Sequence, residues 1–296
     1  FGVSISGLSR SYSTTQSTVS LSGTASDNVG VTSITWKNSA NSTSGTASGT
    51  TSWSITGVSV VSGTNTITLT AKDGVGNSGN DTITVSFSGT TITTGPQAFY
   101  RFDEGTGTIA TDASGNGNNG TINGATWTTG KSGGGLSFNG NDYVIKTNPS
   151  SGLKPSLEVA TAAWIKTSAT DNGGAEIVSM GDNYALRVET NGNIRFFYYN
   201  GSSWNNIKTT GVNVLDGAWH HIVGQKTSTA LQIYVDGISK ASTPNTGTIA
   251  YTRGTDLFIG KYGNGSTNYD FAGSIDDIRI YNRALSDQEV LVLFSN

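Results

Sequence analysis

The chain has 296 residues, of which 34% are hydrophobic, 12% are charged and 40 are glycine. A net charge of −3 and the lack of any run of lysine or arginine argue against nucleic acid as a partner. No apolar stretch approaches the roughly 18 residues of a membrane-spanning helix, and the absence of cysteine excludes disulfides and thiolate chemistry. Short alternating runs between glycine-rich and asparagine-rich turns predict an all-β protein.

Residues 1–88 are predicted to form a small immunoglobulin-like β-sandwich. Apolar and polar residues alternate, as in strands with one buried face, in the runs 19–23, 34–36, 53–55, 66–71 and 82–87. Trp36 is expected to be the core tryptophan. The stretches 24–31 and 71–77 resemble bacterial immunoglobulin-like modules that occur beside secreted catalytic domains.

A short linker is predicted at 89–96, where proline and a threonine run stiffen the chain. After it, a helix of useful length is expected only near the end of the sequence. There Ser286 and Glu289 have the spacing of a capping box, in which each side chain binds the backbone amide of the other residue.

Residues 97–296 carry six ordered motifs. They are Phe-Tyr-Arg-Phe-Asp-Glu-Gly at 99–105, an asparagine-rich loop at 112–120, Leu-Ser-Phe-Asn-Gly at 136–140, Trp-His-His-Ile at 219–222, Ile-Tyr-Val-Asp-Gly at 233–237, and Gly-Ser-Ile-Asp-Asp-Ile-Arg-Ile-Tyr-Asn-Arg-Ala-Leu-Ser at 273–286. In this order they resemble the laminin-G-like (concanavalin A-like, pentraxin-related) family. The resemblance implies a jelly-roll β-sandwich over 97–296, which often holds a structural calcium ion and often binds glycans.

The resemblance also implies candidate calcium ligands. In the family the first and last strands pair, which is expected to bring Asp103 beside Asp276, while a glycine-rich loop supplies Asn116 and the carbonyl of Gly120. These are the oxygen ligands that calcium prefers. Asp112 is a further candidate, although it can instead hold the turn through its own backbone. The alternative is that all five residues only form turns.

The segment 184–199 is predicted to be a hairpin that turns at Gly192-Asn193. Alternate side chains of each strand point to opposite faces, and in one of the two possible arrangements the core side chains are Leu186, Val188, Ile194, Phe196 and Tyr198. Arg187, Arg195 and Tyr199 then face outward, and Trp204 follows in the next loop. Aromatic faces suit the CH groups of sugars, and arginine pairs with carboxylate or sulfate. The pattern therefore indicates a sugar-binding surface, with an acidic glycan as one candidate.

A second aromatic cluster on the later loops includes Tyr262, which we expect to join this surface, and also Tyr251, Arg253 and Tyr269. These residues could instead pack under loops. Similarly, the outward aromatics of the hairpin could be covered by the second sheet. The sequence leaves both alternatives open.

We expect no catalytic activity. The chain has no Glu-x-Asp-x-x-Glu stretch and no motif of a zinc protease or P-loop enzyme. Asp276 and Asp277 are adjacent and would point to opposite faces of a strand, so they cannot flank one glycosidic bond.

The sequence thus predicts a non-catalytic carbohydrate-binding module. Its partner would be a polysaccharide or oligosaccharide, acidic or algal among the candidates. The lack of cysteine and the Ser/Thr/Gly-rich composition favour a secreted bacterial protein, and a start without methionine favours a piece of a larger multidomain chain. An adhesion or structural module that binds a protein is the alternative, and an unusual hydrolase is a third.

Overall fold

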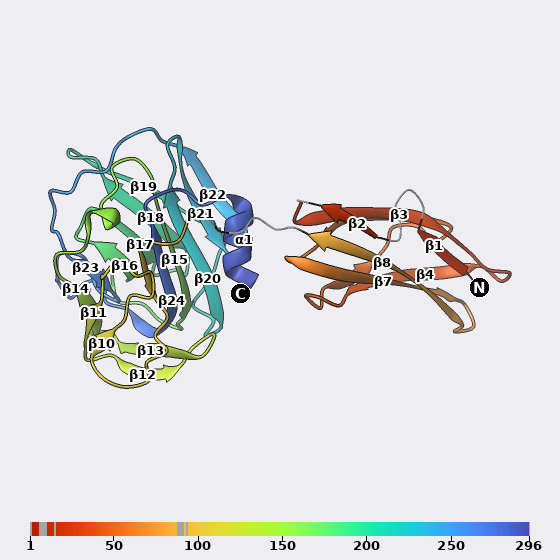
Figure 1. The fold of residues 1–296 in the computed structure, drawn as a ribbon, viewed down its shortest axis with the longest axis horizontal. Helices are drawn as coiled ribbons and strands as arrows, with labels where there is room; N and C mark the ends of the chain where they lie inside the picture. Colours follow the sequence, from red (N-terminus) through yellow and green to blue (C-terminus); the bar gives the residue numbers. More distant parts are fainter. Residues whose placement is uncertain (1, 6–10, 15, 88–91, 93, 296) are drawn as a thin grey trace. The chain divides into compact units, whose positions relative to one another are not determined.

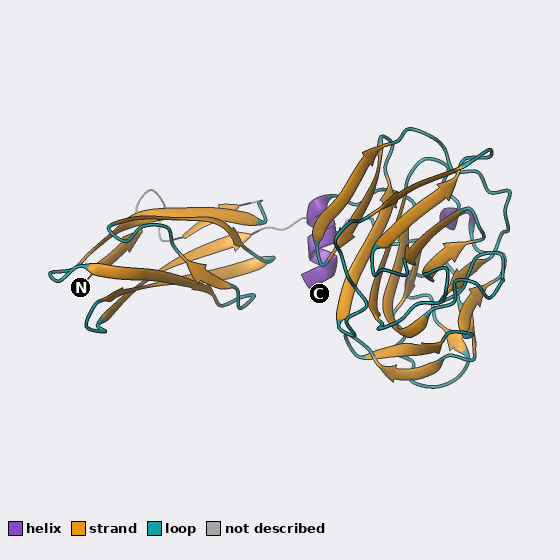
Figure 2. Ribbon diagram, turned by 180° about the vertical axis from the view of Figure 1, so that it is seen from behind, coloured by secondary structure: helices purple, strands orange, loops and turns teal. Residues whose placement is uncertain are grey.

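A computed structural model describes residues 2–5, 11–14, 16–87, 92 and 94–295 (Figure 1). The chain divides into two compact units, Phe1–Thr91 and Ile92–Phe294. Most of the predicted linker at 89–96 therefore falls at their boundary, where residues 89–91 and 93 lie outside the described residues. Strands dominate both units (Figure 2), and the prediction of an all-β protein is confirmed.

Within its described residues, the first unit holds two sheets, with the strand orders β1-β3-β6 and β2-β8-β7-β4-β5. Its strands are β1 (Gly2–Ile5), β2 (Ser11–Thr14), β3 (Thr18–Ser26), β4 (Val31–Asn38), β5 (Ser44–Thr46), β6 (Ser52–Ser59), β7 (Gly63–Asp73) and β8 (Ser78–Phe87). All five predicted runs lie in these strands. Burial alternates along β3 because successive side chains point to opposite faces. That the unit is immunoglobulin-like stays a prediction.

The prediction for Trp36 is wrong. The buried tryptophan of this unit is Trp53 on β6, which is 2% exposed. Trp36 packs only partly against the same core because it lies beside the three-residue edge strand β5. Its indole covers Gly45, where a Cβ atom would come within 2.9 Å of the ring nitrogen.

The second unit holds a front sheet and a back sheet within residues 94–295. The front sheet has the order β10-β11-β14-β23-β16-β17-β18-β19 and the back sheet the order β12-β13-β24-β15-β20-β21-β22, with β9 paired to β24. The front strands are β10 (Ile109–Ala110), β11 (Gly120–Asn123), β14 (Tyr143–Lys146), β16 (Ala175–Met180), β17 (Tyr184–Val188), β18 (Ile194–Tyr199), β19 (Trp204–Lys208) and β23 (Leu257–Ile259). The back strands are β9 (Ala98–Tyr100), β12 (Thr126–Thr129), β13 (Gly134–Asn139), β15 (Val159–Lys166), β20 (Trp219–Lys226), β21 (Ala230–Val235), β22 (Ile238–Pro244) and β24 (Ala272–Tyr281).

Apolar side chains from both sheets form one core between them, as the predicted jelly roll requires. Leu186 and Phe196 of the front sheet and Ile222 of the back sheet are fully buried in it. The sheets approach closely at Gly224, where a Cβ atom would lie 2.6 Å from carbons of both Leu186 and Phe196. Glycine is therefore needed at that position for the two sheets to pack.

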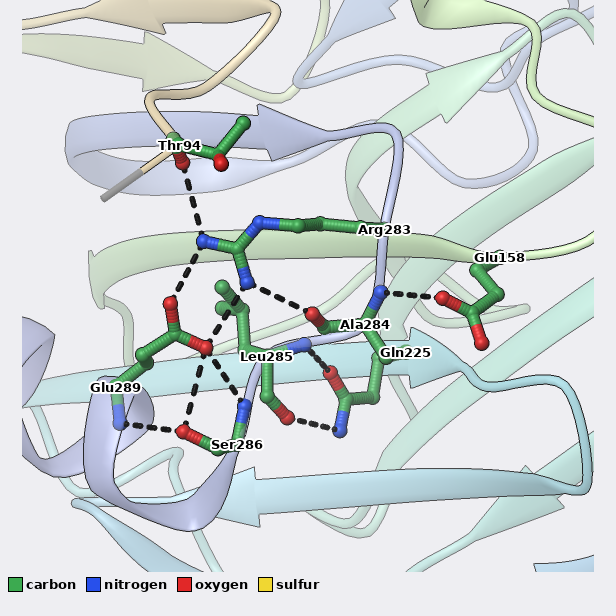
Figure 3. Close-up of polar contacts among 8 residues, drawn as sticks. All are labelled: Thr94, Glu158, Gln225, Arg283, Ala284, Leu285, Ser286 and Glu289. Carbon is green, nitrogen blue, oxygen red and sulfur yellow. Dashed lines mark hydrogen bonds and ion pairs between the residues drawn. The ribbon is translucent and has the colours of Figure 1, made fainter. Parts of the chain in front are cut away.

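The outer face of the back sheet is covered by helix α1 (Asp287–Ser295), which buries Val290 and Leu293 against it. The predicted capping box is confirmed: the Ser286 amide donates to Glu289 Oε2 (2.9 Å), and the Glu289 amide donates to Ser286 Oγ (3.3 Å). Arg283 joins this cap to the start of the unit, because its guanidinium donates to both Glu289 oxygens (2.7 and 2.9 Å) and to the Thr94 carbonyl (3.0 Å), as Figure 3 shows. A functional site is thus expected on the outer face of the front sheet, which this helix does not cover.

A short 3₁₀ turn, η1 (Ser151–Leu153), precedes β15. Leu153 is buried in the core, and its carbonyl accepts a hydrogen bond from the Tyr184 hydroxyl (2.9 Å). This contact ties the connection between the sheets to the hairpin that carries the candidate site.

Candidate functional site

The hairpin of β17 and β18 is built as the sequence predicts. Gly192 takes a φ of +79° in the turn, a left-handed conformation that glycine adopts without strain. The expected core positions are all 0% exposed: Leu186, Val188, Ile194, Phe196 and Tyr198. Their burial fixes the register, so that the intervening residues face away from the core.

A hollow of ≈ 260 Å³ lies on this outer face. We call it the front hollow, and its lining consists of Asp182, Arg187, Arg195, Phe197, Trp204, Asn206, Tyr262 and Tyr269. Strands β17, β18 and β19 supply the central residues, and the loop between β23 and β24 supplies the two tyrosines. Arg187, Arg195, Trp204 and Tyr262, four of the five predicted sugar-binding residues, meet in this hollow.

Tyr199, the fifth predicted residue, lies outside the lining and is 7% exposed. Its ring centroid is 5.0 Å from that of Trp204, and the guanidinium carbon of Arg253 lies 4.2 Å from the Tyr199 centroid. Its hydroxyl donates to the Gly201 carbonyl (2.8 Å). Tyr199 therefore supports Trp204, which is 43% exposed, and presents little surface of its own.

Arg187 forms part of the floor of the front hollow. Its guanidinium lies 3.8 Å from the Tyr269 ring centroid and donates to Glu176 Oε1 at 2.6 Å. Glu176 is completely buried on β16, and this burial raises its pKa to about 7 although the nearby Arg187 charge lowers it. Arg187 Nε and Glu176 Oε2 are buried without a hydrogen-bond partner among the described residues.

Arg195 is also paired. Its Nε and one terminal nitrogen donate to the two carboxylate oxygens of Glu189, both at 2.9 Å. This is the two-pronged geometry that arginine uses for carboxylates. Arg187 and Arg195, which the sequence suggested could bind an acidic glycan, thus both form ion pairs with glutamates of the same chain.

Asp182 and Tyr262 form the polar end of the front hollow. Burial raises the pKa of Asp182, although Tyr262 and the charges of Arg253 and Arg187 lower it. Burial and the Asp182 charge raise the pKa of Tyr262 to about 12, so its phenol stays protonated at neutral pH. The Tyr262 ring lies 5.0 Å from that of Tyr269. The front hollow therefore combines aromatic faces with both donors and acceptors.

The second aromatic cluster divides between the two predicted alternatives. Tyr262 and Tyr269 line the front hollow, while Arg253 lies over Tyr199 and Trp204. Tyr251 instead packs under a loop, where its hydroxyl donates to the Pro155 carbonyl (2.7 Å).

Sequence reasoning missed Asp182 and Asn206 as lining residues. Asn206 could have been found, because it lies two positions after Trp204 and thus on the same face of the strand. Asp182 lies in the Gly-Asp-Asn turn before β17, and no periodicity marks it.

The predicted calcium ligands separate into two groups. Asp112 accepts backbone amides from Phe99, Ser114 and Asn118, each at 2.9 Å. Burial raises the pKa of Asp112, but a hydrogen bond with the Ser114 side chain and these backbone bonds outweigh it and lower the pKa. Asn116 donates to the Gln97 carbonyl (3.2 Å) in the same region. Asp112 thus holds the turn through backbone groups, which was the alternative considered for it.

Gly120 lies in β11, where it pairs with Ala110 and where a Cβ atom would lie 2.5 Å from Val144. Glycine is required there by packing.

Asp103 and Asp276 hold a different loop, at 130–134. The first strand of the unit does pair with the last, but β9 ends at Tyr100, before Asp103. Asp103 accepts the Gly134 amide (2.7 Å), and Asp276 Oδ2 accepts the amides of Lys131 (2.8 Å) and Ser132 (3.1 Å). Asp276 is fully buried with Oδ1 unpartnered, and burial, aided by the charge of Asp277, raises its pKa to about 6.

The five predicted ligands do not converge on one calcium site. Asp112 and Asn116 bind one segment, while Asp103 and Asp276 bind another. Across the described ranges, no three or more histidine, aspartate or glutamate side chains gather in a way that could hold a metal ion.

Comparisons with known proteins agree with the fold. Domain 4 of AbnA, an extracellular arabinanase of glycoside hydrolase family 43 from Geobacillus stearothermophilus solved with arabinotriose, matches 68% of this chain and 98% of its own, with a TM-score of 0.56 and 22% identity. The binding domain of botulinum neurotoxin DC, solved with SialylT, matches 69% of this chain and 52% of its own, with a TM-score of 0.51 and 13% identity. At these identities the matches show the fold alone.

Mouse usherin is 28% identical over 149 residues, which are 47% of this chain and 3% of usherin. The chain thus spans only a small part of that protein. In the described part of the chain, no helix has the length and apolar character needed to cross a bilayer.

A family model also matches the sequence itself, over residues 138–291, which is just over half of the chain and includes the whole β17–β19 region. The chain therefore belongs to the concanavalin A-like lectin/glucanases superfamily, as a laminin-G-type member.

Proposed function

We propose that the second unit is a non-catalytic carbohydrate-binding module. The observation that carries this proposal is the front hollow itself, where the half-exposed Trp204 adjoins arginine, aspartate, asparagine and tyrosine side chains. Flat aromatic rings contact the CH groups of a sugar, while side chains of mixed polarity hydrogen-bond its hydroxyls.

The surroundings of the front hollow suit a chain of sugars. A second hollow of ≈ 570 Å³ shares Asp182 with it, and a third of ≈ 440 Å³ shares Tyr269. A polysaccharide can therefore extend beyond the aromatic centre and gain further contacts on either adjoining surface.

The burial and pairing of the carboxylates near the front hollow agree better with a binding function than with catalysis. Glycoside hydrolysis uses two carboxyl groups that flank the scissile bond. Glu176 is completely buried and bonded to Arg187, and Glu189 is bonded to Arg195. Of the carboxylates at the front hollow only Asp182 is in the lining, and it is 8% exposed.

The wider setting forms part of the same proposal. Family membership and the likeness to a domain of an extracellular arabinanase support an extracellular module that keeps a bacterial polysaccharide-degrading enzyme on its substrate. Tethering raises the local concentration of substrate without new chemistry.

A protein partner has less support. Large apolar side chains are exposed in the described part of the chain at Val29, Val75, Ile109, Leu157, Trp204 and Ile238. These residues lie on separate loops and strands, whereas a protein interface usually presents a contiguous apolar patch.

Affinity electrophoresis against a panel of polysaccharides tests the proposal. We expect at least one gel-embedded polysaccharide to retard the protein, and we expect no new reducing ends after prolonged incubation with it. Migration that is unchanged on every polysaccharide would argue strongly against sugar binding, and released reducing ends would establish a hydrolase instead.

A further inference from the structure

We propose that the front hollow selects neutral glycans and excludes those that bear carboxylate or sulfate groups. This inference rests on the proposed sugar-binding function and names the class of sugar. It follows from how the cations around the front hollow are already used.

The two arginines of the lining are each paired with a glutamate of the same chain. Arg195 donates two parallel bonds to Glu189, and Arg187 donates a 2.6 Å bond to Glu176. These are the same donors that a sugar carboxylate or sulfate would need.

The third arginine, Arg253, offers its flat face to aromatic rings. Its guanidinium carbon lies 4.2 Å from the Tyr199 centroid and 4.1 Å from the Trp204 centroid. The Asp182 charge acts on this arginine as well. Arg253 is therefore placed to build the aromatic platform, close enough to Asp182 for the two charges to interact.

The charges of the front hollow and its adjoining surfaces leave no positive excess. The cations are Arg187, Arg195, Lys208 and Arg253, and the anions are Asp171, Glu176, Asp182, Glu189 and Asp256. Lys208 is exposed and lies opposite Arg195 on β19. An anionic polysaccharide would thus meet a surface that does not attract it at long range.

An anion that bound Arg187 would also break an ion pair within the protein. A carboxylate that captured Arg187 would leave Glu176 buried without its partner, so Glu176 would have to take up a proton or remain as an unpaired buried charge, and either change opposes binding. A sugar hydroxyl makes no such demand, because it donates and accepts at once. It can donate to Asp182, which is in the lining of the front hollow.

The test compares polysaccharides that differ only in charge. The probes are polygalacturonate and its carboxyl-reduced form, and carrageenan and its desulfated form, each embedded in a native gel at low ionic strength. We expect the protein to be retarded more by the neutral member of a pair than by the charged one. Stronger retardation by the charged members would overturn this inference while supporting sugar binding, and no retardation by any probe or by the wider panel would overturn the proposed function as well.

Glu189→Gln provides an independent arm. The change keeps the size of the side chain but removes its charge and one of the two acceptors that bind Arg195. One donor of Arg195 is thereby released, so retention by the charged members should rise by about tenfold, the worth of one charge-assisted hydrogen bond. Retention by neutral members should stay the same. A variant that still ignores the charged probes would contradict the claim that pairing with glutamate excludes anions.

Discussion

The guanidinium carbon of Arg253 lies 4.1 Å from the centre of the Trp204 indole, although the two residues are far apart in the chain. Tyr199 completes the group, because its ring centroid lies 5.0 Å from that of Trp204 and 4.2 Å from the guanidinium carbon of Arg253. A tryptophan that is 43% exposed is thereby held in one orientation. Such a fixed aromatic surface loses little conformational entropy when a ligand binds.

Arg253 is therefore predicted to contribute through its shape. Arg253→Ala and Arg253→Lys should both weaken polysaccharide binding, by about 1 kcal/mol or roughly fivefold, since a lysine ammonium cannot stack as a flat guanidinium does. Titration calorimetry with a retained polysaccharide measures the effect. Full rescue by lysine would instead mean that only the positive charge matters.

Glu176 gives a pH dependence of stability with a defined sign. Its pKa is about 7 in the folded protein and 4.5 in its ordinary state, so between these values the folded chain holds a proton that the unfolded chain has lost. This contribution to stability is greatest below about pH 4.5 and falls as pH rises to about 7. The difference in unfolding free energy between the natural protein and Glu176→Gln should follow this slope, when measured by urea unfolding from pH 4 to 8. A difference that is constant with pH would contradict the assignment.

The contribution of Glu289 to stability is predicted to change with pH in the opposite direction to that of Glu176. Burial raises its pKa, but the bonds from Arg283 and Ser286 outweigh this effect and lower it. Its stabilising contribution is thus present above its ordinary pKa of 4.5 and is lost as pH falls through its lowered value. Glu289→Gln should cost about 1 kcal/mol of unfolding free energy at pH 7, and less in strong acid. An equal cost at both pH values would show that the cap does not depend on charge.

The Asp112 turn is predicted to be held by backbone amides and not by a metal. Asp112→Ala should lower the unfolding free energy by about 1–3 kcal/mol, because three backbone donors lose their acceptor. Treatment with EDTA should leave the melting temperature of the natural protein unchanged. A fall with EDTA that calcium reverses would show that these residues do hold the ion.

Local patterns made much of the second unit predictable. The period-two run of 184–199 fixed which side chains of the hairpin enter the core, and the Ser286–Glu289 spacing located the start of α1. Both features depend only on residues close in sequence, so the chain itself carries the information.

The contacts that Arg187 makes in the front hollow could not be predicted from the sequence. Glu176 meets Arg187 through the register of β16 against β17, which shifts at a bulge between Glu176 and Val178. Tyr269 meets Arg187 through a loop more than eighty residues further along the chain. Because these contacts depend on sheet topology, the arginines looked free in the sequence and are paired in the structure.

The direct test of the account is the affinity of Trp204→Ala for a retained polysaccharide, measured by titration calorimetry. The variant should lose about 2 kcal/mol of binding free energy, roughly thirtyfold, with a nearly unchanged melting temperature because the indole is half exposed. Ile238→Ala, an exposed apolar residue on the back sheet, should bind like the natural protein. Equal affinity of Trp204→Ala and the natural protein would contradict the claim that sugars bind in the front hollow.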